Sequence, residues 1–400
     1  MDLSPSPRAR SFIHRLRAFL DESVYPSEER YQDELRRSGN PHLHAPVLEE
    51  LKREARVREL WNLFMPDERF GPGLSNLEYA PLAELSGRSP LAPEAMNCSA
   101  PDTGNMEILS TFGTKEQQDR WLFPLLSGEI RSCFCMTEPE VASSDPTNLQ
   151  ATIVRDGADL VVNGHKWWTT GAAHENCSVA LFMGVSRADA DRHHRHSLVL
   201  VPLDNPGVSI ARTLPVFGYD DGGGHCEIRF EDVRVPGDSF LGEEGQGFAI
   251  AQSRLGAGRI HHCMRALGLA ERALELMCRR ALQRVAFGKP LADQGRVEEA
   301  IARSRIEIEQ ARLLVLKTAW LIDNEGQRSA RTEISAIKAA VPRVAAGVVD
   351  RAIQVHGGGG LSGDFPLAAM YAHVRSLRIL DGPDEVHEMA VARRELNKHR

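Results

Sequence analysis

An aspartate near the carboxyl end of the chain has the surroundings of a general base. Asp381 lies in the segment Leu380-Asp-Gly-Pro-Asp-Glu-Val-His387. It follows an apolar stretch and precedes Gly-Pro, so the sequence predicts a sharp turn beside the closing helix. A carboxylate held at such a turn can accept a proton from a bound substrate. The alternative is a structural role for Asp381 as the N-cap of that helix.

A second polar stretch, residues 131–145, could bind a flat, charged ligand. An apolar strand breaks at Pro139 into a loop of small hydroxyl residues. Backbone amides and hydroxyls at Thr137, Ser143 and Ser144 suit a polar ring edge and a phosphate. The stretch therefore predicts a cradle for a flavin.

The segment that follows predicts a hairpin and an aromatic wall. The pair Asn163-Gly164 tolerates the positive φ angles of a two-residue turn. Trp167 and Trp168 would then point to opposite faces of the return strand, since side chains alternate along a strand. One of these rings is expected in the core and the other beside the ligand.

Two further motifs predict places on the surface where a ligand could bind. The run Gly358-Gly-Gly-Leu-Ser-Gly363 matches the dinucleotide fingerprint in letters, but a predicted helix precedes it where that fingerprint needs a strand. It therefore predicts a glycine-rich helix end that a ligand can approach. The run Arg284-Val-Ala-Phe-Gly-Lys-Pro290 is either a surface turn or a phosphate clamp with an aromatic platform.

The sequence does not predict a metal site. Cys133 and Cys135 are alternate residues of one strand, and no second pair has matching spacing, so structural thiols are expected. His193, His194 and His196 occupy a charged loop and are expected to be solvated.

Composition indicates a globular protein without nucleic-acid partners. The chain has 400 residues, 26% of them charged, and a net charge of −7, which gives no basic surface for nucleic acid. No apolar run approaches the length of a membrane span, and the first residues lack the features of a secretory signal. Arginine outnumbers lysine. We expect a cytoplasmic protein, of bacterial source.

Hydrophobic periodicity predicts an α+β fold with three parts: an all-α domain at 1–131, a small β-barrel or sandwich at 132–240, and a helical bundle at 241–400. In the first part a helix is expected to end before Pro26, and Thr114-Lys-Glu-Gln117 is a capping box. Residues 97–106 are expected to be irregular, either as a packed connection or as the lining of a substrate cavity. The third part is expected to contain a four-helix bundle.

Taken in order along the chain, these motifs resemble the acyl-CoA dehydrogenase family over essentially the whole sequence. Met136-Thr-Glu-Pro139 and Trp167-Trp-Thr-Thr-Gly171 look like the family's flavin-binding β segments. The run at 284–290 resembles its inter-subunit flavin clamp, and Gln354-Val-His-Gly-Gly358 resembles its glycine-rich flavin contact. The sequences around Trp61, Ala100 and Asp381 are most similar to those of a branch whose animal members are fused behind a phosphotransferase-like domain.

The resemblance implies a fold, a cofactor and site residues. It implies an N-terminal all-α domain, a middle β domain and a C-terminal four-helix bundle. It implies that FAD is bound by Phe134, Cys135, Met136, Thr137, Ser143, Ser144, Trp168, Thr169, Thr170, Arg284, Phe287, Gln354, Gly357, Gly358, Pro383 and Glu385. Among these, Arg284 and Phe287 would reach the flavin of a neighbouring subunit, which requires a homodimer or a dimer of dimers. Substrate contacts would come from Ser144, Arg259 and Gly382.

The chemistry implied by the resemblance centres on Asp381. This base would remove the α-proton of an acyl-CoA thioester while the β-hydride goes to flavin N5, giving the trans-2-enoyl-CoA, with an electron-transfer flavoprotein as acceptor. The family commonly has glutamate there, so the shorter aspartate needs a closer backbone, and burial is expected to raise its pKa. Relatives that place the base on the long helix would use position 258, where Gly258 cannot serve.

The chain departs from the family three residues before Arg259, where Gly256 replaces a frequent aspartate. That change puts the contact with CoA at this point in question. Two other functions remain open: a flavin oxidase on the same fold, acting on acyl-CoA or on nitroalkanes, and a non-catalytic acyl-CoA or flavin-binding protein. The length and branching of the acyl group, and the choice between dimer and tetramer, are also open.

Overall fold

The structure is a computed structural model that describes the backbone of residues 1–220 and 222–400, and the side chains of these residues except 255–257. The expectation about Gly256 therefore lies outside the described residues. The chain divides into two units. We call residues 27–72 and 94–255 the sheet unit, and residues 1–26, 73–93 and 256–400 the helical unit.

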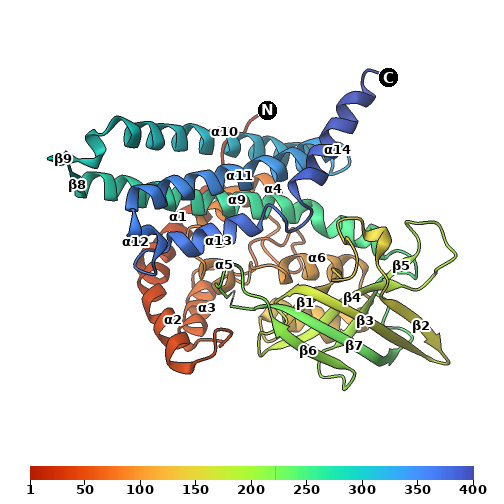
Figure 1. The fold of residues 1–400 in the computed structure, drawn as a ribbon. Helices are drawn as coiled ribbons and strands as arrows, with labels where there is room; N and C mark the ends of the chain where they lie inside the picture. The colour runs from red at the N-terminus through yellow and green to blue at the C-terminus, as the bar shows by residue number, and fades with distance from the viewer. Residues whose placement is uncertain (221) are drawn as a thin grey trace. The chain divides into compact units, whose positions relative to one another are not determined.

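Helices dominate the first 130 residues (Figure 1). They are α1 Pro7–Phe19, η1 Leu20–Val24, α2 Tyr25–Ser38, α3 Pro46–Val57, α4 Asn76–Ser86, α5 Ala92–Ala95, α6 Asp102–Phe112, α7 Lys115–Gln117, η2 Gln118–Leu122 and α8 Phe123–Ser127. The predicted capping box is present, with Thr114 and Gln117 each bonding the other's backbone. Gly128 ends α8 in the left-handed conformation, as a helix C-terminus favours.

Two predictions for this region were wrong. The helical run does not end before Pro26, because a π-turn at Leu20–Val24 leads directly into α2. Proline is tolerated in the first turn of a helix, where its missing N–H is not needed. Residues 97–106 are not irregular throughout, since α6 begins at Asp102.

The sheet unit contains a seven-stranded sheet (Figure 1). Its strands are β1 Arg131–Cys135, β2 Thr152–Asp156, β3 Asp159–Thr170, β4 Cys177–Val185, β5 His196–Pro202, β6 Val208–Thr213 and β7 His225–Pro236, with the short helix η3 at Pro146–Asn148. The order is β1-β4-β2-β3-β7-β6, and β5 pairs with β4. Strand β1 runs parallel to β4, whereas β3 pairs antiparallel with both β2 and β7. Phe182 and Phe230 meet in the core with ring centroids 4.8 Å apart.

The predicted hairpin at Asn163-Gly164 was wrong, because β3 runs straight through that pair. The reversal occurs earlier, at Gly157, whose φ of +63° suits a tight turn. Asn163 and Gly164 coincide instead with a register shift between β3 and β7. A glycine inside a strand often marks such a bulge.

The C-terminal helices match the predicted helical bundle. They are α9 Gly247–Gln283, α10 Gly295–Glu325, α11 Arg331–His356, α12 Gly358–Leu361, α13 Leu367–Ser376 and α14 Asp384–Asn397. Strands β8 Val285–Ala286 and β9 Lys289–Pro290, followed by η4 Leu291–Asp293, join α9 to α10. Within the helical unit α10 and α11 lie side by side, and α11 also packs against α13 and α14 (Figure 1).

None of the helices in the described part of the chain has the length and hydropathy to cross a bilayer. The predicted divisions at residues 131 and 240 stay predictions. The irregular segment before α6 is a packed connection at Asn97, whose side chain is buried and donates to Asn62 Oδ1 at 2.7 Å.

Candidate functional site

Asp381 stands on a strained turn at the start of the last helix. Its φ is +56°, in the left-handed region, and that of Gly382 is +99°. Aspartate enters this region more readily than most residues, because its short side chain tolerates the geometry. The N-cap of α14 is Pro383. The alternative role of Asp381 as an N-cap is therefore wrong.

Three basic side chains of the helical unit fix the backbone of this turn. Arg259 Nη2 on α9 donates to the Asp381 carbonyl at 3.2 Å, and His387 Nε2 on α14 donates to the same oxygen at 3.1 Å. Lys338 Nζ on α11 donates to the carbonyls of Gly382, at 3.1 Å, and Leu377, at 2.6 Å. Three helices thus hold the turn in the conformation that presents the Asp381 carboxylate.

The Asp381 side chain itself remains accessible. Its relative exposure is 24%, and its Oδ2 lies 3.4 Å from His262 Nε2 on α9. Burial lowers the pKa of His262 to about 4, against the opposing attraction of Asp381. Burial also lowers the pKa of His387 to about 4. Both imidazoles are neutral at neutral pH and can act as hydrogen-bond donors without adding charge.

The first turn of α14 is anchored by the residue after Pro383. Asp384 is buried, and its Oδ2 accepts hydrogen bonds from Arg343 Nε at 2.9 Å and from Arg378 Nε at 2.7 Å. Glu385, predicted to contact the flavin, is exposed. The anchor at Asp384 therefore leaves Pro383 and Glu385 on the accessible side of the turn.

In the sheet unit, the segment after β1 rests on a buried ion pair. Lys166 Nζ donates to Glu138 Oε1 at 2.7 Å and to the carbonyls of Met136, at 3.0 Å, and Met183, at 2.7 Å. The Glu138 carboxylate also accepts from two backbone amides, at 2.7 and 3.0 Å. Burial lowers the pKa of Lys166, and Glu138 opposes this shift. The pair fixes the carbonyl of Met136 from beneath.

The two tryptophans do not alternate as predicted. Trp168 has a φ of +51°, and the register between β3 and β7 shifts between Lys166 and Thr169. As a result neither ring is fully buried, and the residues of this stretch that enter the core are Lys166 and Thr169. The Trp168 ring lies 6.2 Å from that of Trp167 and 5.6 Å from that of His225.

Two polar atoms beside these rings are buried without a partner among the described residues. They are Trp167 Nε1 and Thr169 Oγ1. A buried donor without a partner costs about 1–3 kcal/mol, so such groups usually meet a ligand or water. The Trp167 backbone N–H meanwhile donates to the Thr137 carbonyl at 3.0 Å, which ties the two predicted flavin segments together. The residues at this edge therefore fit a polar ring ligand such as a flavin.

The other residues of the sheet unit that were predicted to bind the flavin differ in exposure and in their contacts within the chain. Ser143 Oγ accepts from the Glu138 N–H at 2.9 Å and so closes its own loop, whereas Ser144 is exposed. Phe134 is half-buried under the Arg254 guanidinium, 4.5 Å from its ring centre. Thr170 Oγ1 pairs with His225 Nδ1 at 2.9 Å. Cys135 is buried, with its Sγ 3.8 Å from that of Cys133.

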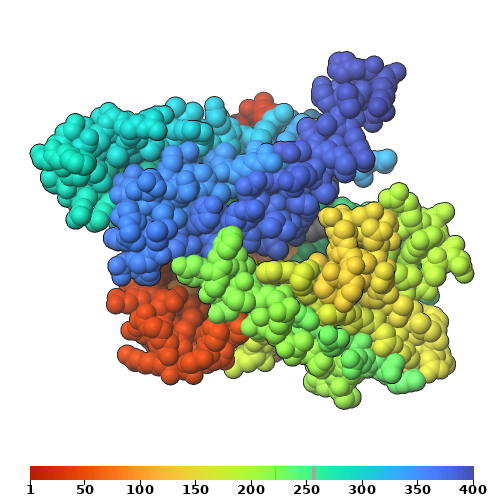
Figure 2. Space-filling view, viewed as in Figure 1, coloured from red at the N-terminus to blue at the C-terminus, as the bar shows by residue number. Residues whose placement is uncertain are grey.

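The predicted clamp forms the tip of the α9–α10 hairpin. Phe287 has a φ of +54° and is 99% exposed, and Gly288 follows with a φ of +78°. Arg284 lies just before β8 and is also exposed. Figure 2 shows this end of the helical unit, in teal, at the left edge of the surface. An aromatic ring that contacts nothing in its own chain is available to another molecule.

The glycine-rich motif is the end of a helix, as predicted. Gly357 closes α11 with a φ of +63°, and methyl groups at Gly357 or Gly358 would meet nothing within 4 Å. Gln354 is exposed on the last turn. Gly360 has a different reason to be glycine, since a methyl group there would lie 2.7 Å from the Ile353 carbonyl. Among the four consecutive glycines 357–360, the two open ones are those that were predicted to contact a ligand.

Sequence reasoning missed the residues that support the site. Lys338, His262 and Arg343 lie on helices, Arg378 lies in the turn after α13, and no motif marks any of the four. Their only signal is a basic residue on a helix face that the apolar period assigns to the core, as with the fully buried Lys338. The burial of Lys166 beneath the flavin segments was equally hidden, since strand alternation is interrupted there.

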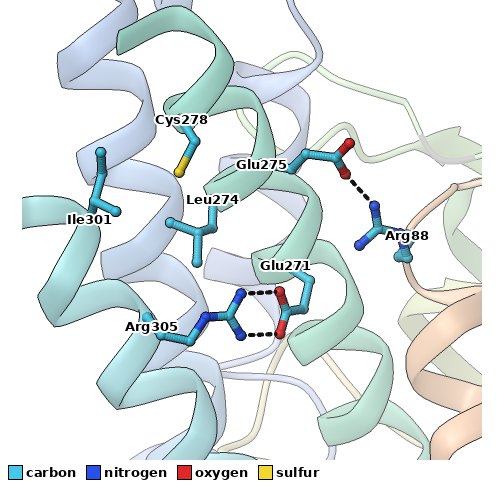
Figure 3. Close-up of a pocket in the computed structure, with 7 residues that line it drawn as sticks. All are labelled: Arg88, Glu271, Leu274, Glu275, Cys278, Ile301 and Arg305. Carbon is cyan, nitrogen blue, oxygen red and sulfur yellow. Dashed lines mark hydrogen bonds and ion pairs between the residues drawn. The ribbon is translucent and has the colours of Figure 1, made fainter. Parts of the chain in front are cut away.

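A hollow elsewhere in the helical unit is not part of this site. It has a volume of about 440 Å³ and is lined by Arg88, Glu271, Leu274, Glu275, Cys278, Ile301 and Arg305. Figure 3 shows its charges paired internally, with Arg305 on Glu271 at 2.7 and 2.8 Å and Arg88 on Glu275. None of the predicted site residues lines it.

The prediction that His193, His194 and His196 are solvated was wrong for His196, which is fully buried at the start of β5. Among the residues that the structure describes, no three His, Cys, Asp or Glu side chains are grouped so that they could hold a metal ion. Cys133 is fully buried, and hydrogen bonds from neighbouring thiols together with burial raise its pKa well above the ordinary value. A protonated thiol is a poor metal ligand, which supports the structural role predicted for it.

Family models match almost the whole chain. Those of the N-terminal, middle and C-terminal domains of acyl-CoA dehydrogenases match residues 6–129, 133–233 and 245–396. The Mycobacterium tuberculosis protein named probable acyl-CoA dehydrogenase FadE2 is 57% identical over all of this chain and 98% of its own length. Mouse acyl-CoA dehydrogenase family member 10 and chicken family member 11 are each 52% identical over 98% of the chain. The chain spans 37% and 51% of the length of these two animal relatives.

Solved structures of acyl-CoA dehydrogenases also resemble this chain. A Mycobacterium abscessus protein described as an acyl-CoA dehydrogenase is 53% identical and superimposes with a TM-score of 0.96 over 99% of this chain and 100% of its own. Butyryl-CoA dehydrogenase from Megasphaera elsdenii is 25% identical, with a TM-score of 0.83 over 99% of this chain and 100% of its own.

Proposed function

Because this chain belongs to the acyl-CoA dehydrogenase family, an FAD-dependent oxidoreductase family, we propose that it dehydrogenates an acyl-CoA thioester between its α and β carbons. Asp381 is the base in this proposal. The observation that carries it is the accessible Asp381 carboxylate on a left-handed turn whose two carbonyls are held by Arg259, His387 and Lys338. A structural aspartate has no need of such support.

The proposed reaction begins with proton transfer to Asp381. When bound, FAD supplies the acceptor for the β-hydride. Asp381 takes the α-proton, and its backbone N–H is assigned to the thioester oxygen on which charge develops. A preorganised donor of this kind contributes about 3–4 kcal/mol to stabilising the transition state. Arg259 and His387 hold the carbonyl of the same residue, so they orient both the base and its N–H.

The proposal assigns FAD binding to residues in both units. In the sheet unit these are Phe134, Cys135, Met136, Thr137, Ser143, Ser144, Trp168, Thr169 and Thr170. The buried Trp167 Nε1 and Thr169 Oγ1, which have no hydrogen-bond partner among the described residues, support this assignment. In the helical unit Pro383 and Glu385 are assigned to FAD binding.

A second copy of the chain is also part of the proposal. Arg284, Phe287, Gln354, Gly357 and Gly358 are assigned to the flavin of a neighbouring subunit. The full exposure of Phe287 and the open space over Gly357 and Gly358 support this assignment. The active protein is then a homodimer or a dimer of dimers.

Substrate contacts are assigned to Ser144, Gly382 and Arg259. The Arg259 guanidinium bonds the Asp381 carbonyl, so its contribution to substrate binding includes the placement of the base. We further assign the reduced flavin's electrons to an electron-transfer flavoprotein.

Anaerobic mixing of the purified yellow protein with a panel of straight and branched acyl-CoA thioesters tests the proposed reaction. Loss of the flavin's visible absorbance with at least one thioester is expected. A protein that stays yellow with every thioester would favour a non-catalytic flavin-binding function. Oxygen uptake during turnover, compared with reduction of an electron-transfer flavoprotein, distinguishes an oxidase from a dehydrogenase.

A further inference from the structure

We propose that His262 is a positioning residue for the base, with its Nε2–H facing the Asp381 carboxylate and favouring its ionised form. This inference rests on the proposed function, because it assigns a role to the partner of the catalytic group. It concerns a residue that no sequence motif marks and that is distant in sequence from the turn that carries the base. His262 lies on α9, and Asp381 lies before α14.

The geometry supports a direct interaction. His262 Nε2 and Asp381 Oδ2 are 3.4 Å apart, and the two side chains are similarly accessible, at 25% and 24%. The backbone on each side is fixed, since α9 is continuous through His262 and the Asp381 carbonyl is held by Arg259 and His387. The two side chains therefore meet because their backbones are held in place.

The charge around His262 favours a neutral ring. Arg265 of its own helix, His373 on α13 and Lys338 on α11 all disfavour a proton on the imidazole, whereas the charge of Asp381 favours it. Burial acts in the same direction as the three basic groups. The ring is then neutral at neutral pH, and it can donate through one nitrogen only.

A neutral His262 suits the function of Asp381 as a base better than a protonated one. A protonated histidine would hold the carboxylate so firmly ionised that proton transfer to it would be opposed. A neutral N–H orients the oxygen and favours the charged form only modestly. His262 would thus keep Asp381 deprotonated near neutral pH without removing its ability to accept the α-proton.

A matched pair of variants separates this role from simple packing. His262→Gln keeps an N–H donor near the position of Nε2, whereas His262→Met fills similar space without a donor. The rate of flavin reduction by acyl-CoA is measured against pH for both. In His262→Met the acid limb should move to higher pH by about 0.5–1 unit, because the ionised form of Asp381 has lost its donor. In His262→Gln it should stay within about 0.2 unit of the wild type.

A spectroscopic measurement tests the contact without turnover. In holoprotein labelled with 15N-histidine, the signals of His262 are identified by their loss in His262→Gln. At pH 7 the ring nitrogens should show the neutral tautomer protonated at Nε2, and the Nε2 proton should shift in Asp381→Asn. The tautomer protonated at Nδ1, or no shift in Asp381→Asn, would overturn the inference.

The outcomes distinguish this inference from the proposed function. If no acyl-CoA reduces the wild-type flavin, the proposed function fails. If the wild type is reduced while the Met and Gln variants keep the same acid limb, only the role of His262 fails. His14→Ala, at an exposed position of α1, serves as the control for the loss of one histidine.

Discussion

At the scale of the residue, the turn that carries Asp381 explains why its neighbour is glycine. Gly382 has a φ of +99°, and a methyl group there would lie 2.9 Å from His387 Nε2. His387 is also the donor to the Asp381 carbonyl. The backbone angle and the contact with His387 both exclude a side chain.

Gly382→Ala is therefore expected to disturb the base without removing it. Strain at a positive φ costs about 1–3 kcal/mol, and displacement of His387 releases the Asp381 carbonyl. We expect a lower free energy of unfolding by that amount and slower flavin reduction, as measured by urea unfolding and anaerobic mixing. Gly363→Ala is the control, since its methyl group would meet nothing within 4 Å. Equal behaviour of the two variants would contradict the role given to Gly382.

The structure also explains why an aspartate can occupy this place. The family resemblance implies glutamate as the common base, and the shorter side chain of aspartate then requires a closer backbone. The backbone at Asp381 is left-handed, and aspartate is among the residues that adopt this conformation most readily. The expectation that burial raises the pKa of Asp381 stays a prediction.

At the scale of the element, the buried pair Lys166–Glu138 supports the segments assigned to the flavin. Both side chains are almost fully buried, and five hydrogen bonds join them to each other and to four backbone groups. Removing one partner of a buried pair leaves an uncompensated charge, which costs about 3–5 kcal/mol.

Lys166→Met should lower the free energy of unfolding by about 3–5 kcal/mol and weaken flavin retention. The double variant Lys166→Met/Glu138→Gln should recover part of this loss, because the unpaired carboxylate is then neutral. Urea unfolding of the two single variants and the double variant measures the coupling. Additive losses would show that the pair does not act as a unit.

Elements with local signals could be predicted from the sequence, and those that depend on distant partners could not. The capping box at Thr114 and the apolar period of the C-terminal helices are local, and both predictions were confirmed. Asn163-Gly164 carries a turn signal, but pairing of β3 with β7 absorbs it as a bulge. Pro26 likewise predicts a helix end, but the preceding π-turn leads directly into α2, where Pro26 occupies the first turn.

In the candidate site, too, the residues with local sequence signals could be predicted and those that act through distant contacts could not. Asp381 and its Gly-Pro turn are visible in the sequence, as are the segments at 134–137 and 168–170. The donors that hold the turn come from positions up to 122 residues away, as for Arg259 and Asp381. A side chain that acts through tertiary contacts leaves no local pattern, so Lys338 and His262 could not be found.

At the scale of the whole molecule, the exposed hairpin tip tests the assignment of a second subunit. Phe287 contacts little in its own chain, since 99% of its surface is exposed. Phe287→Ala should therefore leave the free energy of unfolding within about 0.5 kcal/mol of the wild type. If the ring clamps a neighbour's flavin, the same variant should lose flavin faster on dilution. Val285→Ala in the same hairpin is the control, and equal flavin retention in both variants would argue against the clamp.

Buried histidines in both units give the molecule an acid limit. Burial lowers the pKa of His174, His262 and His387 to about 4 each. Between that value and the ordinary 6.5 the unfolded chain binds the extra protons, so stability falls as pH falls through this window. Glu107 acts in the opposite direction, since burial raises its pKa to about 7. Burial also lowers the pKa of His196, His261 and His356, so the histidines outweigh Glu107 and stability is lost on acidification.

The free energy of unfolding should accordingly decrease from pH 6.5 to pH 4.5, by up to about 1.4 kcal/mol per pH unit for each histidine that is neutral only in the folded state, with solvent screening reducing this slope. Urea unfolding at several pH values measures it. His174→Gln should make the slope shallower, while the exposed control His14→Ala should not change it. A flat profile over this window would contradict the neutral state given to these histidines.

The base itself is tested most directly by Asp381→Asn. The asparagine keeps the shape of the turn and its tolerance of a positive φ, so the variant should fold and remain yellow. On anaerobic mixing with a thioester that bleaches the wild type, its flavin absorbance should persist, with the rate of reduction lower by a factor of at least about 10³. Asp384→Asn is not a substitute, since Asp384 anchors Arg343 and Arg378. Reduction of the Asp381→Asn flavin at a rate near that of the wild type would place the base elsewhere.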